Sequence, residues 1–299
     1  MALVQKITPS LWFDGNAKEA VDFYTSIFPS GEVLNTSYYP TEGLADFQKD
    51  MAGKVLTLEF ILAGHRFSAI NAGPEFKFNQ SNSFMVNFDT SYDEQAKEHL
   101  DEVWGKLIDG GEAMMALGEY PFSPYYGWVK DRYGLSWQLS LSDPKDGEVP
   151  CIVPTLLFGG PHQNQAEDAI NYYVSVFRDA SVGVMARYPI DTGPATAGKL
   201  KYANFTLENQ LFSAMDSGVV QDVTFNEAVS YVIACKDQEE IDYYWSKLSS
   251  TPENEPCGWC KDKFGVSWQI IPANMGELMQ KPDAFTHMMQ MKKIVIEDF

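Results

Sequence analysis

The chain has 299 residues, of which 45% are hydrophobic and 21% charged, and a formal net charge of −19. This composition excludes a disordered chain and provides enough length for two domains, each with its own core. The negative charge would repel phosphate backbones and anionic membrane surfaces, so we expect no nucleic-acid partner and no membrane partner.

The first predicted elements are a strand and a helix. Thr8–Phe13 is a short apolar run led by Pro9, which suits the start of a strand. Residues 16–28 repeat apolar side chains at helical spacing, and Asn16 with Glu19 forms a candidate N-terminal cap.

Strands dominate the rest of the first half. Lys54–Leu62 turns at Ala63-Gly64 into His65–Ile70, and Phe84–Asp89 reads as a further strand. A second helix carries Trp104. Asp131–Gln138 then reads as a tight turn into a strand on which Ser136 and Gln138 share one face and Trp137 lies on the other.

The same order recurs in the second half of the chain. Asp262–Gln269 repeats Asp131–Gln138 with Asp, Gly, Ser, Trp and Gln all in place, and Val153–Phe158 repeats the first strand. The duplication predicts an α+β protein made of four modules, each with a strand, a helix and three more strands (βαβββ). The two repeats should form an internal pseudo-dimer.

The domain boundaries follow from this duplication. Repeat one covers residues 1–143 and repeat two covers residues 151–273, with a linker rich in Asp and Pro at 142–150. Residues 274–299 form a tail with a helical pattern at 274–290 and a candidate terminal strand at Lys293–Ile296. Whether two chains pair further is left open.

Several segments resemble one protein family. They are Phe13–Ala20 with Phe23-Tyr24, Phe225–Ser230, Asp242–Trp245 and Cys257–Gln269. They are similar to the PhnB-like branch of the vicinal-oxygen-chelate superfamily, which includes glyoxalase I, bleomycin-resistance proteins and extradiol dioxygenases. That branch is often labelled 3-demethylubiquinone-9 3-methyltransferase. The resemblance implies tandem glyoxalase-like domains whose sheets curl into cups around a cavity.

The resemblance also implies where a metal would bind. The corresponding positions are Pro9, Glu59, Ser83 and Gln138 in repeat one, and Pro154, Asn204, Ser230 and Gln269 in repeat two. A catalytic divalent ion usually takes three protein ligands, and proline and serine are poor substitutes for histidine or glutamate. We therefore expect no metal and no other cofactor. No Gly-rich loop for S-adenosylmethionine is visible despite the family's label.

Glu59 is the candidate catalytic residue. It lies within an apolar strand, where a carboxylate is either a cavity acid or base, or an edge group in water. The four histidines are scattered along the sequence without partners at ligand spacing.

The candidate ligand-binding residues are mostly the polar and tryptophan side chains that recur in both repeats. They are Trp12, Ser83, Trp137, Gln138, Asn204, Ser230, Cys257, Trp268 and Gln269. Trp12 has no tryptophan counterpart, so the two pockets should differ. Cys257-Gly-Trp-Cys260 has the spacing of a redox pair, but the repeat places it on a strand, where the two thiols face opposite sides. A cavity-facing Cys257 and an inert thiol are both left open.

Three functions remain in view. The first is a cytoplasmic protein that binds a small organic molecule in tryptophan-lined pockets. The second is a lyase, isomerase or dioxygenase-type enzyme that uses Glu59 and Gln138. The third is a scaffold whose cavity is filled by its own side chains. Fold-level similarity cannot choose among them.

Overall fold

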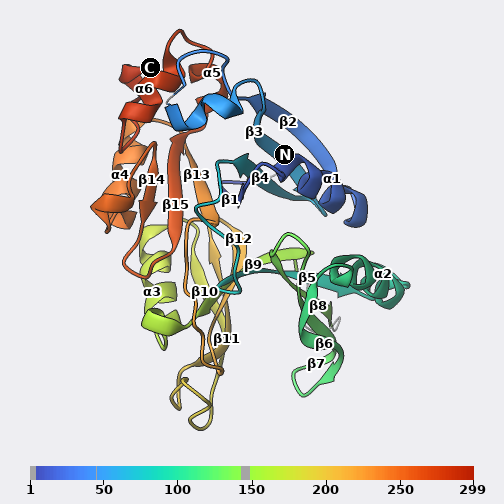
Figure 1. The fold of residues 1–299 in the computed structure, drawn as a ribbon. Coiled ribbons are helices and arrows are strands. Elements are labelled where there is room, and N and C mark those ends of the chain that lie inside the picture. The colour runs from blue at the N-terminus through green and yellow to red at the C-terminus, as the bar shows by residue number, and fades with distance from the viewer. Residues whose placement is uncertain (1–4, 45, 143–148) are drawn as a thin grey trace.

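The computed structural model describes residues 5–44, 46–142 and 149–299. The predicted linker lies almost wholly outside the described residues, and so does the predicted boundary at residue 143. The elements fall into four consecutive modules that each begin with a strand and a helix (Figure 1).

The first three modules have the predicted order. The first consists of β1 (Ile7–Phe13), α1 (Ala17–Ile27), β2 (Glu32–Tyr38), β3 (Val55–Leu62) and β4 (His65–Asn71). The second consists of β5 (Asn82–Asp89), α2 (Ala96–Ile108), β6 (Glu112–Tyr120), β7 (Ser123–Lys130) and β8 (Ser136–Ser142). The third consists of β9 (Ile152–Phe158), α3 (Ala166–Val176), β10 (Ser181–Arg187), β11 (Leu200–Leu207) and β12 (Gln210–Asp216).

The fourth module is shorter than predicted. It consists of β13 (Val229–Cys235), α4 (Gln238–Leu248), β14 (Trp259–Lys261) and β15 (Ser267–Pro272). A short 3-10 helix, η4 (Pro252–Asn254), follows α4 where the other modules have a strand. The remaining short helices are η1 (Asp46–Met51), η3 (Gly160–His162), α5 (Met275–Leu278), α6 (Ala284–Gln290) and η5 (Ile296–Asp298).

The strands form two sheets, and each sheet takes strands from both repeats. Sheet A has the order β14-β15-β13-β1-β4-β3-β2, and sheet B has the order β10-β11-β12-β9-β5-β8-β7-β6. The first module therefore joins the fourth, through the antiparallel pair β1 and β13, and the second joins the third, through β5 and β9. Helices α1 and α4 pack on one face of sheet A, and α2 and α3 pack on one face of sheet B (Figure 1). Among the described residues, no such helix packs on the opposite, concave face of either sheet.

The strands alternate as their sequences predict. Leu11 and Phe13 of β1 are buried toward the helices, whereas Trp12 between them is only half-buried on the concave face. A strand with one helix-covered face requires this period of two, because successive side chains point to opposite faces. The predicted α+β class with curled sheets is confirmed.

The N-terminal cap of α1 differs from the prediction. Asn16 makes no capping hydrogen bond, and the N–H of Ala17 instead donates to Oδ1 of Asn71 at 2.9 Å. In the third module, the N–H of Ala166 donates to Oδ1 of Asp216 at 3.1 Å. The cap thus comes from the end of a strand distant in sequence, which local capping rules cannot identify.

The C-terminal tail packs on the fourth module. Two short helices, α5 and α6, replace the single predicted helix, and Lys293–Ile296 is not a strand. The N–H groups of Cys257 and Gly258 donate to the carbonyls of Met291 and Lys292 at 2.8 and 2.7 Å. No helix within the described part of the chain is long and apolar enough to cross a membrane.

Candidate functional site

A row of polar side chains crosses the concave face of each sheet. Row A joins five residues on neighbouring strands of sheet A: Gln269, Ser230, Ser10, Ser68 and Glu59. Row B joins the matching residues of sheet B: Gln138, Ser83, Thr155, Ser213 and Asn204. Six of the eight positions implied by the resemblance lie in these rows.

The structure regroups those positions. Glu59 of repeat one shares row A with Ser230 and Gln269 of repeat two, so a grouping by repeat does not hold. Pro9 and Pro154 lie on the helix-facing side, because Ser10 and Thr155 occupy the concave positions beside them. Alternation along those two strands was the signal that could have identified Ser10 and Thr155.

The polar groups of row B mostly bond to other protein groups. Gln138 donates through Nε2 to Oγ of Ser83 at 2.8 Å and accepts at Oε1 from the hydroxyl of Tyr126 at 2.6 Å. The hydroxyls of Thr155 and Ser213 lie 2.6 Å apart. Oδ1 of Asn204 accepts from the N–H of Val184 at 2.7 Å, so this amide holds the edge strand β10. Row B therefore has little hydrogen-bonding capacity to spare.

The polar groups of row A are largely unpaired. Gln269 donates to Oγ of Ser230 at 2.9 Å, but its Oε1 has no partner among the described residues, because Cys257 stands where repeat one has Tyr126. Within that same part of the chain, the side chains of Ser10 and Ser68 also form no hydrogen bond. Row A thus keeps donors and acceptors that the fold does not use.

Ser267, beside row A, carries a buried hydroxyl without a partner. Its residue is 1% exposed, and its Oγ is one of the few buried side-chain polar atoms left unpaired among the described residues. The equivalent Ser136 in sheet B accepts from Nε1 of Trp128 at 2.6 Å. The equivalent Trp259 instead packs edge-on against Trp12, with ring centroids 5.8 Å apart. A buried polar group without a partner is costly in a native protein, so a water, an ion or a ligand that satisfies it would stabilise the fold.

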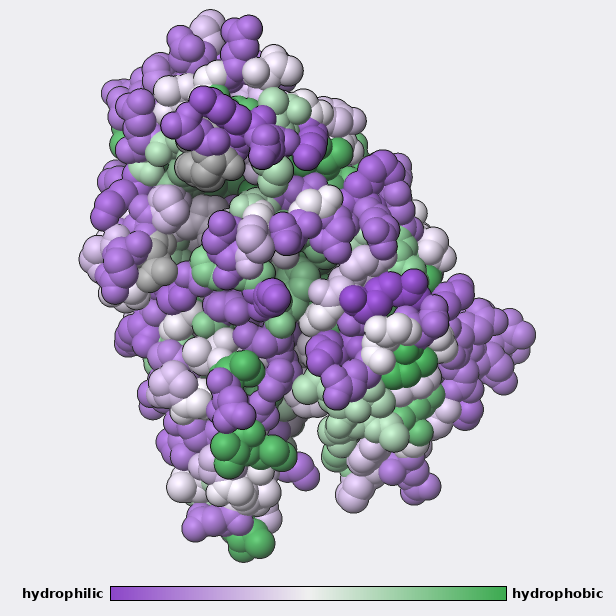
Figure 2. All heavy atoms as spheres, in the orientation of Figure 1, coloured by the Kyte–Doolittle hydropathy of each residue, from purple (hydrophilic) through white to green (hydrophobic). Residues whose placement is uncertain are grey.

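Aromatic rings form one wall of the concave face of sheet A. Trp12 packs edge-on against Phe76 at 5.0 Å as well as against Trp259, and its Nε1 donates to the carbonyl of Gly73 at 2.8 Å. The matching position in sheet B is Leu157. Figure 2 shows that sheet B instead opens into a hollow between its two lower arms, β10–β11 and β6–β7. The concave faces of the two sheets therefore differ, as the unmatched Trp12 predicts.

The predicted roles of Trp137 and Trp268 are wrong, because both side chains lie on the helix-facing side. They are 0% and 1% exposed, and their indole N–H groups donate to Asp131 and Asp262 at 2.9 and 2.8 Å. Each lies on a strand next to a glutamine that faces the concave side, so the tryptophan must face the core.

Cys257 contacts the C-terminal tail. It lies in the turn before β14 with φ of 54°, and its Sγ lies 3.7 Å from Sδ of Met289. Cys260 is buried on β14, and all four cysteines are free thiols. The pair is separated by a turn rather than placed together at a helix start, so the thioredoxin-type geometry is absent.

Comparison with known proteins identifies the family. The family model described as 3-demethylubiquinone-9 3-methyltransferase matches residues 5–140 and again residues 150–271. The chain belongs to this family. Its two matches coincide with the two repeats of the structure.

The chain is similar to several solved structures. A PhnB protein from Bacillus cereus is 38% identical and covers 46% of this chain and 100% of its own, with a TM-score of 0.40. Glyoxalase I from Zea mays is 13% identical and covers 91% of this chain and 95% of its own, with a TM-score of 0.51. The latter likeness shows the vicinal-oxygen-chelate fold across both repeats. No curated protein matches the sequence.

The residues on the concave faces do not fit a catalytic divalent metal. Row A offers one carboxylate, Glu59, beside hydroxyls and an amide, and row B offers no carboxylate. No group of three His, Cys, Asp or Glu side chains comes together within residues 5–44, 46–142 and 149–299. Gly159 precedes the short helix η3, which begins at Gly160.

His65, at the start of β4, is a half-buried histidine on the helix-facing side of that strand. Its ring packs edge-on against Phe67 at 5.1 Å, and burial lowers its pKa to about 4. Because this folded-state pKa lies below the usual value of about 6.5, His65 stabilises the fold above pH 6.5, and that stabilisation is lost as the pH falls toward 4.

This shift gives a measurable pH dependence. We expect wild-type protein to lose on the order of 2 kcal/mol more stability than His65→Gln between pH 7 and pH 4, a value reduced because the ring is only partly shielded from water. Urea unfolding of both proteins across that range measures the difference. Parallel stability curves for the two proteins would contradict the assignment.

Proposed function

We propose that the concave face of sheet A binds a small organic molecule non-covalently, and that sheet B serves mainly as a scaffold. The single observation that carries the proposal is the unpaired polar set of sheet A, above all the buried Oγ of Ser267. A ligand that hydrogen-bonds there would remove the cost of leaving that hydroxyl unsatisfied. The vicinal-oxygen-chelate fold, whose sheets curl around such faces, supports the same function.

The chemical character of the ligand follows from the lining. Trp12, Phe76 and Trp259 offer an aromatic wall that favours a flat, apolar body. Oγ of Ser267 and Oε1 of Gln269 can pair with a hydroxyl, amide or carbonyl-bearing group on that body. We therefore expect an aromatic molecule with a few neutral polar substituents. The free thiols support a reducing, cytoplasmic location.

A matched pair of serine variants tests this proposal. Ser267→Ala should leave the stability of the free protein unchanged or slightly raised, because it removes an unpaired buried hydroxyl, and should weaken ligand binding about tenfold. Ser136→Ala at the equivalent position of sheet B should lower stability by about 1 kcal/mol, because Trp128 loses its acceptor, and should leave binding unchanged.

Binding can be followed by the fluorescence of Trp12 and Trp259 during titration with a panel of substituted phenols, naphthols and quinolones. Native mass spectrometry of gently purified protein would identify any retained adduct. Binding that is unaffected by Ser267→Ala but lost in Ser136→Ala would contradict the assignment to sheet A.

A second function is favoured by the position of Glu59. The carboxylate is exposed, lies opposite Ser68 in the register of β3 and β4, and forms no side-chain hydrogen bond or ion pair in the described part of the chain. It could act as an acid or base on a ligand held against Ser267. Under this alternative, Glu59→Gln would retain ligand affinity and abolish conversion of the ligand, which product analysis by mass spectrometry would detect.

A further inference from the structure

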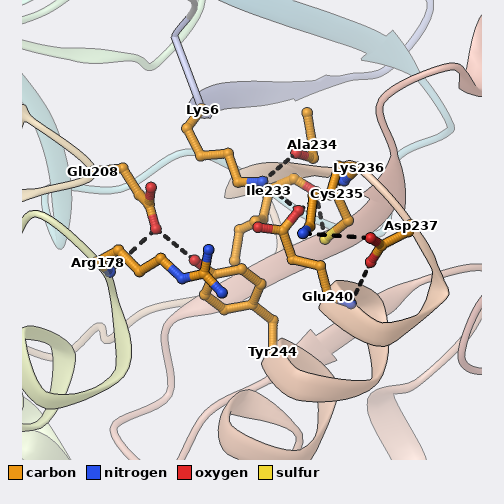
Figure 3. Close-up of polar contacts among 10 residues, drawn as sticks. All are labelled: Lys6, Arg178, Glu208, Ile233, Ala234, Cys235, Lys236, Asp237, Glu240 and Tyr244. Carbon is orange, nitrogen blue, oxygen red and sulfur yellow. Dashed lines mark hydrogen bonds and ion pairs between the residues drawn. The ribbon is translucent and has the colours of Figure 1, made fainter.

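A second polar cluster lies where the first, third and fourth modules meet (Figure 3). Nζ of Lys6, just before β1, pairs with Oε2 of Glu240 on α4 at 2.7 Å and donates to the carbonyl of Ala234 at 2.6 Å. The hydroxyl of Tyr244 donates to Glu208 of the β11–β12 turn. These contacts tie sheet A to sheet B on the side away from the concave faces.

The cluster borders a cavity of about 110 Å³, enough for several water molecules or one small solute. Its lining residues are Arg178, Lys236, Asp237, Glu239, Glu240, Tyr243 and Tyr244. The cavity is separate from the proposed site on sheet A.

Most charges at this cavity already have partners. Glu240 binds Lys6, and Lys236 lies 3.5 Å from Asp237. The guanidinium of Arg178 and the carboxylate of Glu239 form no hydrogen bond or ion pair within the described residues. The cavity therefore presents one guanidinium and one carboxylate whose hydrogen-bonding groups are not used within the described residues.

The duplication acts as an internal control for what the fold requires. The N–H of Glu208 donates to the carbonyl of Arg178 at 2.9 Å, and the equivalent N–H of Ala63 donates to the carbonyl of Pro29 at 2.8 Å. The backbone arrangement is thus the same at the equivalent junction, but the charged side chains are not. At the equivalent junction, the residues of the cluster are replaced in order: Lys6, Arg178, Glu208, Glu240 and Tyr244 by Cys151, Pro29, Ala63, His99 and Val103. The same backbone arrangement thus forms without these charges at the equivalent junction, and the charges are specific to one junction.

The surroundings of Glu240 and Tyr244 determine their protonation states. Burial opposes ionisation of Glu240, but hydrogen bonds from Lys6 and from the N–H of Lys236, with the nearby charge of Arg178, lower its pKa below the usual range. Burial raises the pKa of Tyr244, so its phenol remains a neutral donor. Arg178 and Glu239 thus lie beside charges that Lys6, Glu240 and their hydrogen bonds hold in place.

We propose that this cavity binds a small zwitterion, an α-amino acid with a short side chain. Its carboxylate would lie against Arg178, whose planar, forked donors match that group, and its ammonium would lie against Glu239. The carboxylates of Asp237 and Glu240 and the net charge of −19 disfavour a multiply charged anion. The volume is sufficient for glycine or alanine.

Titrations followed by protein NMR test the proposal on the full chain. The probes are glycine and L-alanine, with N-acetylglycine as the anion-only analogue and glycinamide as the cation-only analogue. Both zwitterions should bind about tenfold tighter than either analogue, because each analogue loses one charged contact. Equal affinity for all four probes, or no binding of glycine and alanine, would overturn the proposal.

Matched variants locate the site. Arg178→Gln and Glu239→Gln should each weaken glycine binding about tenfold. Arg66→Gln and Glu119→Gln remove exposed charges of the same types elsewhere and should leave it unchanged. All four positions are at the surface, so circular dichroism should report the same fold. Glycine binding that survives both cavity variants would also overturn the proposal. Because Ser267→Ala should not alter it, this result is independent of the proposed site on sheet A.

Discussion

Replacement of Asp262 by alanine is expected to lower the free energy of unfolding by about 3–5 kcal/mol. The buried carboxylate accepts from the hydroxyl of Tyr173 and from Nε1 of Trp268, both at 2.8 Å. It also accepts from the N–H groups of Phe264 and Val266 at 2.8 and 3.1 Å. Alanine would leave four donors without a partner in a closed core, and each buried orphan is costly.

The duplication supplies an independent repetition of this test. Asp131 accepts from the hydroxyl of Tyr24 at 2.8 Å and from Nε1 of Trp137 at 2.9 Å, so Asp131→Ala should cost a similar amount. Asp222→Ala removes an exposed carboxylate and should change stability by less than about 0.5 kcal/mol. Urea unfolding with circular dichroism measures all three variants. A cost at Asp262 no larger than that at Asp222 would show that these carboxylates do not organise the core.

Neither repeat is expected to fold as a monomer by itself. Each sheet joins strands of both repeats through its central pairs, β1 with β13 and β5 with β9. A chain ending at residue 142 would expose the edge of β1 that pairs with β13 and the edge of β5 that pairs with β9. Apolar side chains along those edges would be exposed as well. Such edges pair with another chain or aggregate. We therefore expect each half alone to be either unfolded or self-associated.

Size-exclusion chromatography with light scattering tests this expectation on residues 1–142 and 149–299, produced separately and together. Co-produced halves should form a one-to-one complex whose circular dichroism spectrum matches that of the intact chain, because every strand pair is restored. This complex also serves as a control, because it shows whether the fold survives when the chain is cut between the two halves. A cooperatively folding monomer of residues 149–299 would show that the repeats, rather than the crossed sheets, are the folding units.

The sequence by itself determined the duplication, the α+β class and the faces of the strands. Alternation alone placed Gln138 opposite Trp137, and the structure has the glutamine on the concave face and the tryptophan in the core. The assignment of Trp137 and Trp268 to a pocket was wrong because it set aside that same alternation. Strands report their faces locally, so these features needed no knowledge of the fold.

Only the tertiary structure decided which strands pair. β5 and β13 carry nearly the same pattern because they are copies, so no local signal could tell β1 to pair with β13 rather than with β5. Three features depend on that choice. They are the presence of Glu59 in one row with Ser230 and Gln269, the packing of Trp12 against Trp259 beside Ser267, and the cluster around Lys6. Duplication makes each module recognisable in the sequence, but it leaves two equally good candidates for the strand that pairs with β1. The choice between them is made by packing between segments that lie far apart along the chain.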